Sequence, residues 1–119
     1  MAKIKEGTGI QENILANGVL AAVEAEIYAC PAMSQARLTT VVCHNTHAAN
    51  TNTVKLFLQP SGGVSRRIAN QDLLPGASLK GKDGIVEPLR LNEGDSLRGE
   101  ATNAGEVAWT ISGVEESVI

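Results

Sequence analysis

The last third of the chain reads PLRLNEGDSLRGEA over residues 88–101 and VAWTISGVE over residues 107–115, and it carries the clearest structural signal in the sequence. Apolar and polar side chains alternate in both pieces, as they do in a strand with one face in a core and the other in water. The tetrapeptide NEGD, Asn92 to Asp95, supplies a tight turn between two of the alternating runs. This stretch therefore predicts antiparallel strands.

The same pattern extends upstream through most of the chain. Residues 37–45 hold a β-branched cluster, and residues 53–59 put Val54, Leu56 and Leu58 on one face. Residues 60–63, Pro-Ser-Gly-Gly, predict a hairpin connection. Residues 19–29 have helical propensity in their Ala and Glu content, but their alternation and the following Pro31 favour a strand. The predicted strands are 19–29, 37–45, 53–59, 64–70, 72–80, 84–91, 96–102 and 107–114.

About eight short strands, separated by turns, are typical of an all-β protein with two packed antiparallel sheets. The sequence predicts a two-sheet β-sandwich, either a jelly roll or an immunoglobulin-like fold, and periodicity does not choose between them. One domain is expected over residues 13–119. Residues 1–12 are polar, contain glycine and lack periodicity, which predicts an extended N-terminal arm.

Composition narrows the classes of function. Tyr28, Phe57 and Trp109 are the three aromatic residues, so the core must be built from small aliphatic side chains. Such a core buries less apolar surface per residue, which leads us to expect a homo-oligomer that buries more. The net charge is −3, with acidic and basic residues interspersed. A nucleic acid is therefore not an expected partner, because no broad basic field is available for its backbone.

Two cysteines, Cys30 and Cys43, are too few for a disulfide scaffold. Cys43 lies in an alternating apolar run, where a free thiol behaves as a small hydrophobe, so we expect the cysteines to be reduced and buried. The first residues carry positive charge without an apolar stretch behind it. We therefore expect neither a secretion signal nor a membrane-spanning segment.

Candidate chemical groups have simpler structural interpretations. Cys43, His44 and His47 are possible zinc ligands, but they lack a Cys-x-x-Cys pair, and neighbours in a strand point to opposite faces. The carboxylates available as an acid–base pair are explained by turns and solvent-exposed faces; they are Glu93, Asp95, Glu100, Glu115 and Glu116. The sequence thus assigns no catalytic residue, metal ligand or cofactor site.

Basic residues mark two possible contact points. Arg66 and Arg67 are the one adjacent pair of arginines, and Lys3 and Lys5 flank Ile4 in the arm. A charged pair on a strand often protects a sheet edge from aggregation. The functional interpretation is that Lys3, Ile4, Lys5, Arg66 and Arg67 contact a capsid protein or a neighbouring subunit.

The order of segments resembles the small β-sandwich virion proteins of tailed bacteriophages. The resemblance covers about residues 20–116, and it is carried by TTVVCHN at 39–45, residues 48–52, TVKLFL at 53–58, LPGASL at 74–79, LNEGDSL at 91–97 and ISGVE at 111–115. The pattern consists of strands and turns and contains no catalytic signature.

The resemblance implies a non-enzymatic virion structural protein. Its first implication is a capsid decoration, or cement, protein that stabilises the head lattice from the outer capsid surface after assembly in the host cytoplasm. The implied partners are the major capsid protein or other virion proteins, and further copies of the chain, with a trimer favoured. The alternatives are a tail, neck or baseplate accessory protein and, from another class, a glycan- or receptor-binding module.

Overall fold

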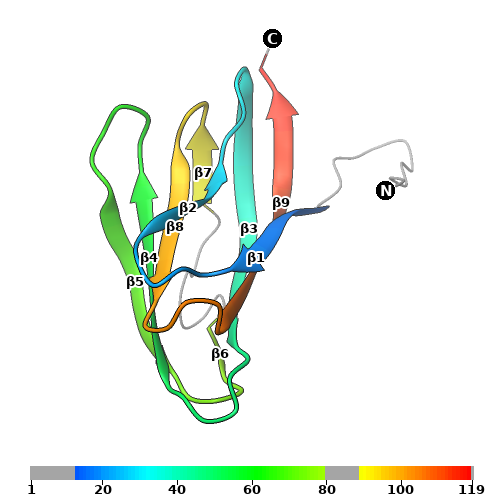
Figure 1. The fold of residues 1–119 in the computed structure, drawn as a ribbon. Helices are drawn as coiled ribbons and strands as arrows, with labels where there is room; N and C mark the ends of the chain where they lie inside the picture. The colour runs from blue at the N-terminus through cyan, green and yellow to red at the C-terminus, as the bar shows by residue number, and fades with distance from the viewer. Residues whose placement is uncertain (1–12, 80–88, 119) are drawn as a thin grey trace.

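The computed structural model describes residues 13–79 and 89–118, which form nine strands (Figure 1). Their bounds are β1 Asn13–Val19, β2 Ala25–Ala29, β3 Ser34–Asn45, β4 Asn52–Gln59, β5 Arg66–Leu73, β6 Ser78–Leu79, β7 Leu89–Asn92, β8 Ser96–Ala101 and β9 Val107–Ser117. Within these residues, no helix is long and apolar enough to cross a membrane. The predicted arm with Lys3, Ile4 and Lys5, and residues 84–88 of a predicted strand, lie outside the described residues.

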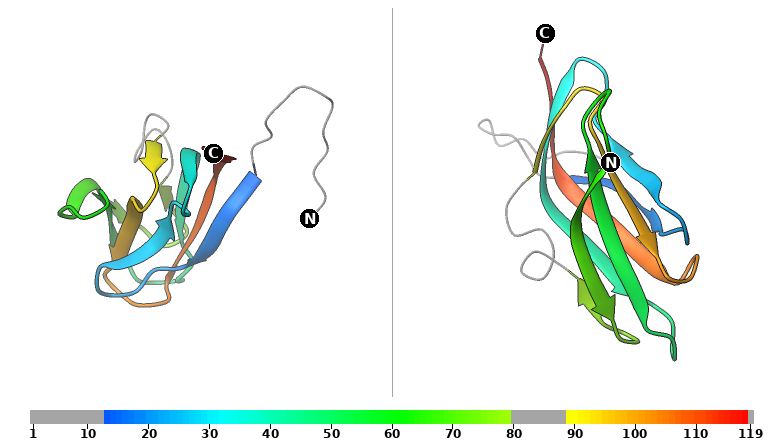
Figure 2. Two further views of the ribbon diagram at one scale, coloured as in Figure 1. Left: turned by 90° about the horizontal axis from the view of Figure 1, so that it is seen from above. Right: turned by 90° about the vertical axis from the view of Figure 1, so that its left-hand side faces the viewer.

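The strands form two antiparallel sheets packed face to face (Figures 1 and 2). Sheet A has the order β1-β9-β3-β6, and β7 also pairs with β3, beside its first half. Sheet B has the order β2-β8-β4-β5. The predicted all-β sandwich is confirmed.

The connectivity decides between the two sandwich types that periodicity left open. The chain crosses from sheet A to sheet B between β1 and β2, returns for β3, and crosses again for β4. The last strand, β9, inserts between β1 and β3. Repeated crossing with this nested pairing is the double Greek key of a jelly roll.

The single strand predicted over residues 19–29 is wrong in its bounds. β1 already ends at Val19, and β2 begins at Ala25 after a turn. The pairing of β2 with β8 shifts register between Glu26 and Tyr28, so that Tyr28 is buried and Ile27 only partly so. A β-bulge therefore replaces the simple alternation that the sequence suggested.

The predicted hairpin after β4 is confirmed, and its return strand is longer than expected. Gly63 donates a backbone hydrogen bond of 2.8 Å to the Pro60 carbonyl, and Gly62 has a φ of 72°. The return strand, β5, continues to Leu73. It thus takes in the start of the strand predicted over residues 72–80, of which β6 retains two residues, Ser78 and Leu79.

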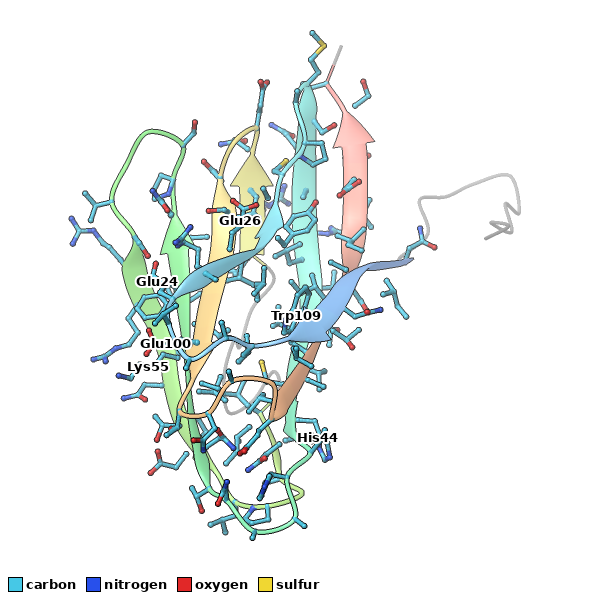
Figure 3. All side chains as sticks on the ribbon, in the orientation of Figure 1. Glu24, Glu26, His44, Lys55, Glu100 and Trp109 are labelled. Carbon is cyan, nitrogen blue, oxygen red and sulfur yellow. The ribbon has the colours of Figure 1, made fainter. Side chains whose placement is uncertain are left out.

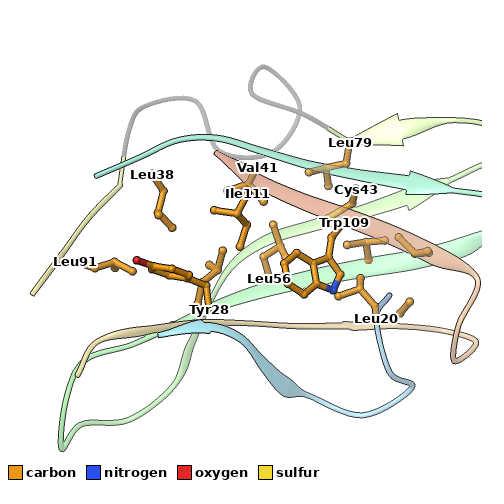
Figure 4. Close-up of a cluster of buried hydrophobic side chains, with 14 of the residues drawn as sticks. Leu20, Tyr28, Leu38, Val41, Cys43, Leu56, Leu79, Leu91, Trp109 and Ile111 are labelled. Carbon is orange, nitrogen blue, oxygen red and sulfur yellow. The ribbon is translucent and has the colours of Figure 1, made fainter. Parts of the chain in front are cut away.

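The core between the sheets is dominated by leucine and other aliphatic side chains (Figure 4). Leu56, Leu97 and Ile111 are fully buried, and the two aromatic members are Tyr28 and Trp109. Gly18 lies opposite Trp109 in the sheet, and a Cβ there would be 3.0 Å from the indole ring. The aromatic-poor core expected from composition is confirmed, with glycine making room for its largest side chain.

Candidate functional site

Among the described residues, the outer face of sheet A carries no charged side chain along β1, β6, the second half of β3 and the part of β9 that pairs with β1. Strand register places ten outward-facing residues side by side on β1, β9, β3 and β6. They are Ile14, Asn17, Val19, Thr40, Val42, His44, Ser78, Ala108, Thr110 and Ser112. We call this surface the uncharged face. Its two aliphatic side chains on β1, Ile14 and Val19, are 65% and 60% exposed.

The outer face of sheet B has the opposite character. Register puts Glu26 of β2 opposite Arg98 of β8, and Lys55 of β4 opposite Glu100 of β8. Figure 3 labels Glu26, Lys55 and Glu100 among the side chains of this sheet. Opposite charges in facing positions stabilise a sheet and keep its surface hydrated. The two faces of the sandwich therefore differ in what they can bind.

An ion pair extends the charged surface into the turn before β2. Arg98 Nε donates to a Glu24 carboxylate oxygen at 2.7 Å, and Ser65 Oγ donates to the same oxygen at 2.6 Å. The hydrogen bond from Ser65, followed by that from Arg98, holds the pKa of Glu24 below its ordinary value. These contacts link β8, the β2 turn and the segment before β5.

The possible zinc ligands around Cys43 are separated by the strand. Cys43 is fully buried in the core, and burial raises the pKa of its thiol to about 12. His44 lies on the uncharged face, with Nδ1 2.7 Å from Ser78 Oγ. The opposite orientation predicted for these neighbours is confirmed. Across residues 13–79 and 89–118, no three Cys, His, Asp or Glu side chains gather in a way that could hold a metal ion.

A buried polar network closes one end of the sandwich. Asn45 and Asn52 are fully buried. Asn45 Nδ2 donates to the carbonyls of Asn50 and Leu73 at 2.8 and 2.9 Å, and Asn52 Nδ2 donates to Glu106 Oε1 at 3.0 Å. The network ties the loop before β4 to the loop before β9. Its polar groups are satisfied within the chain, so it holds loops together and offers no free ligand.

His47 belongs to the same network. Its Nδ1 accepts the backbone N–H groups of Ala49 and Asn50 at 3.0 and 2.9 Å, and its Nε2 lies 3.7 Å from Glu106 Oε2. Hydrogen bonds from Asn52 and Asn50, in that order, and then the nearby His47, lower the pKa of Glu106. The side chain of His47 therefore holds this loop in place, in agreement with its interpretation as a loop histidine rather than a zinc ligand.

Two of the carboxylates considered for acid–base chemistry hold turns in place. Asp95 accepts the backbone N–H groups of Ser61 and Asn92 at 2.8 and 2.9 Å. Glu93 accepts the backbone N–H of Met33 at 3.0 Å. These contacts support the structural interpretation of both residues.

Arg66 and Arg67 do not form one basic patch. Both are exposed on β5, the edge strand of sheet B. Register sets Arg67 opposite Phe57 and Arg66 opposite Leu58, so the two side chains leave opposite sides of the sheet. Their role as contact residues stays a prediction.

Sequence reasoning missed the uncharged face. Its signal is present in the outward positions of β3 and β9, where Thr40, Val42 and Thr110 replace the charged residues common on exposed strands. The face becomes visible only when the pairing of four strands is known, because its members come from four separate segments.

Comparison with known proteins supports the fold. Neither a protein-family model nor a curated protein matches the chain. A solved chain from Bacillus endospore appendages, described as disulfide-linked pili, is 14% identical with a TM-score of 0.50, and the match covers 100% of this chain and 98% of that one. A chain from infectious bursal disease virus is 10% identical with a TM-score of 0.39, and this chain covers 37% of it.

Proposed function

We propose that the protein is a non-enzymatic structural subunit of a multi-subunit assembly, and that it associates through the uncharged face. The observation that carries this proposal is the contrast between the two outer faces of the sandwich. Charged residues are depleted from the centres of protein interfaces, because burying an unpaired charge is costly. The uncharged face of sheet A meets this condition, and the outer face of sheet B does not.

The pattern of side chains on the uncharged face suits association with another flat surface. Thr, Ser, Ala and Val are short, so they leave a smooth surface with little side-chain entropy to lose on contact. Hydroxyl groups of Thr40, Thr110 and Ser112 can exchange hydrogen bonds with a partner while the aliphatic groups of Ile14 and Val19 are covered. This combination is typical of an interface with a hydrophobic and a polar part.

At finer detail, we propose a capsid decoration protein of a tailed bacteriophage. The support is the resemblance of the strand order to such virion proteins, together with a jelly-roll fold and a core poor in aromatic residues. The protein would bind the major capsid protein on the outer surface of the head, as a trimer, after assembly in the host cytoplasm. Many copies of one modest contact would give a strong attachment to the lattice.

The alternatives within the virion are a tail, neck or baseplate accessory protein. The glycan-binding alternative has less support, because sugar recognition favours exposed aromatic platforms. Tyr28 and Trp109 are buried, and Phe57 is only partly exposed.

A second candidate function is a subunit of a pilus-like fibre. The specific observation in its favour is that the chain aligns over its whole length with the chain from the endospore appendages, of which the match covers 98%. In that case the uncharged face would contact further copies of the same chain, and no capsid would be needed.

The experiment compares one added charge on each face. Thr40→Lys adds a lysine to an exposed position of the uncharged face, and Asn70→Lys adds one to an exposed position of β5 in sheet B. The purified parent and both variants are examined by analytical ultracentrifugation, by electron microscopy for fibres, and by cosedimentation with empty phage heads and with isolated tails.

Loss of association in Thr40→Lys, with Asn70→Lys behaving like the parent, is the expected result. Saturable binding to heads identifies a decoration protein, binding to tails an accessory protein, and fibres formed without phage particles a pilus-like subunit. Equal behaviour of the two variants in every assay would show that the uncharged face is not the interface.

A further inference from the structure

Two arginines face each other at one end of sheet A, beyond the uncharged face. The pairing of β3 with β7 sets Arg37 directly opposite Arg90, and both side chains are exposed. Facing positions on antiparallel strands bring side chains close together, so two like charges there repel and destabilise the pair. A negative charge close to both guanidinium groups would offset this repulsion.

The described part of the chain does not supply that charge in direct contact. Its ion pairs are Arg98 with Glu24 and His47 with Glu106, and neither guanidinium of the facing pair takes part. Glu116 of β9 lies opposite Gln35, which precedes Arg37 by two residues on β3 and faces the same side of the sheet. It is therefore diagonal to Arg37 and forms no ion pair with it.

The two arginines line a surface pocket that has further polar groups. Its walls include Gln35, Asn92 and Glu116, and Val114 contributes apolar surface beside Arg37. Gln35 Nε2 donates to Asn92 Oδ1 at 3.3 Å, which holds the two amides together. The pocket thus combines two guanidinium groups, one carboxylate and an amide pair on three neighbouring strands.

We propose that this pocket binds a single carboxylate group, presented by an acidic side chain of a neighbouring subunit in the assembly proposed above. The formal charges of Arg37, Arg90 and Glu116 sum to one positive charge, which matches a monoanion. The planar guanidinium fork binds carboxylates through paired hydrogen bonds. A phosphate dianion fits less well, because Glu116 would repel its second charge. The inference rests on the proposed function only for the identity of the partner.

The binding test uses the isolated protein and small probes, so it does not depend on any assembly. The probe is the acetylated, amidated derivative of glutamic acid, which carries one side-chain carboxylate, and its glutamine counterpart is the uncharged control. Backbone amide signals are followed by NMR during titration with each probe, and with inorganic phosphate. The variants are Arg37→Gln and Arg90→Gln, with Arg67→Gln as a matched exposed arginine outside the pocket.

We expect saturable shifts at residues 35–38 and 90–92 with the glutamate probe, and at least a tenfold loss of affinity in Arg37→Gln and Arg90→Gln but not in Arg67→Gln. The glutamine probe should cause no saturable shift. Tighter binding of phosphate than of the glutamate probe, or no saturable binding of either, would overturn the proposal. A negative result in this titration would not contradict association through the uncharged face, because Thr40→Lys tests that association separately.

A stability measurement shows whether an acidic residue of the same chain neutralises Arg37 and Arg90. If nothing in the chain offsets the repulsion between Arg37 and Arg90, Arg90→Gln should raise the midpoint of thermal unfolding at low salt. Added salt screens the repulsion, so it should reduce this increase. A lowered midpoint in Arg90→Gln, restored towards the parent value when Asp83 or Glu87 is also made neutral, would show that an acidic residue of the same chain occupies the pocket. That result would overturn the proposal of an external carboxylate.

Discussion

Tyr28 on β2 donates a hydrogen bond from its phenol to a carboxylate oxygen of Glu115 on β9, 87 residues further along the chain. Because β2 belongs to sheet B and β9 to sheet A, this contact ties the two layers together. Tyr28 is 7% exposed, so its ring lies in the core while its hydroxyl reaches Glu115 at the surface. The pair therefore anchors the end of the sandwich where the chain finishes.

Removal of this hydroxyl should destabilise the fold. Tyr28→Phe keeps the buried ring and loses a hydrogen bond to a charged group, so we expect a loss of about 1–2 kcal/mol in the free energy of unfolding. Urea unfolding, followed by fluorescence of the single tryptophan, Trp109, measures it. Glu115→Gln retains an acceptor and should cost less. Unchanged stability of Tyr28→Phe would show that the contact contributes nothing.

The same pair predicts a loss of stability in alkali. Burial, and then the hydrogen bond to Glu115, raise the pKa of Tyr28 well above its ordinary value. The unfolded chain loses the phenol proton near pH ~10 while the folded chain retains it, so the stability falls as the pH rises above about 10. Tyr28 is the only tyrosine, so ultraviolet absorbance reports it alone. Phenolate absorbance that appears while Trp109 fluorescence is still native would contradict this prediction.

Glu106 should make the protein sensitive to acid. The hydrogen bond from Asn52 is the main reason that the pKa of Glu106 is lowered in the folded protein. The carboxylate therefore contributes its full stabilisation above the ordinary glutamate pKa of about 4.3, and this stabilisation is lost as the pH falls through the lower pKa of the folded state. Glu106→Gln should reduce the stability at neutral pH and flatten its decline in acid. Part of the decline of stability in acid should remain in this variant, because the pKa of Glu24 is also lowered. Thermal unfolding across the acid range is the measurement, with Glu26→Gln as the control. An identical pH profile for Glu106→Gln and the parent would refute the assignment.

Gly113 marks a position where β9 tolerates no side chain. A Cβ there would lie 2.1 Å from the backbone oxygen of Arg37, so the main chain of β3 or β9 would have to move. We expect Gly113→Ala to cost about 3 kcal/mol or more, at the upper end of overpacking effects. Gly63→Ala, whose Cβ would meet the Pro60 side chain at 3.3 Å, is the control and should cost less. Chemical denaturation compares them, and similar values for both would argue against this close approach.

Both cysteines should resist thiol reagents in the native protein. Cys43 is fully buried with a pKa of about 12, and burial, followed by the charge of Glu115, raises the pKa of Cys30. The reactive thiolate is therefore scarce and shielded. Labelling should become fast only under denaturing conditions, and Cys30→Ser isolates the response of Cys43. Rapid reaction of the native Cys30→Ser variant would show that the core opens more readily than its burial implies.

Local patterns in the sequence predicted the central strands and two of the turns, the hairpin after β4 among them. The alternation in residues 53–59 places Val54 and Leu56 in the core, as expected. The turn after β7 also follows the prediction: Gly94 has a φ of 86°, and Asp95 donates a backbone hydrogen bond of 2.9 Å to the Asn92 carbonyl. These features depend on neighbouring residues, so a short window of sequence contains the information for them.

The strand β1 and the bulge in β2 were not predictable in this way. Asn13 to Val19 shows weak alternation, and it becomes a strand because β9 pairs with it along its length. The bulge between Glu26 and Tyr28 follows from the fit of β2 against β8. Both depend on partners about 70 to 100 residues away, which local propensity cannot represent.

Composition and local alternation were enough to specify an aromatic-poor, all-β chain with glycine turns, because each of these properties is local or compositional. The folded chain was needed to see that the sandwich is a jelly roll, that Thr40 and Thr110 share an uncharged face, and that Arg37 lies opposite Arg90. Strand pairing joins segments that are distant in the sequence, and a shift of one residue in register would turn each of these side chains to the other face.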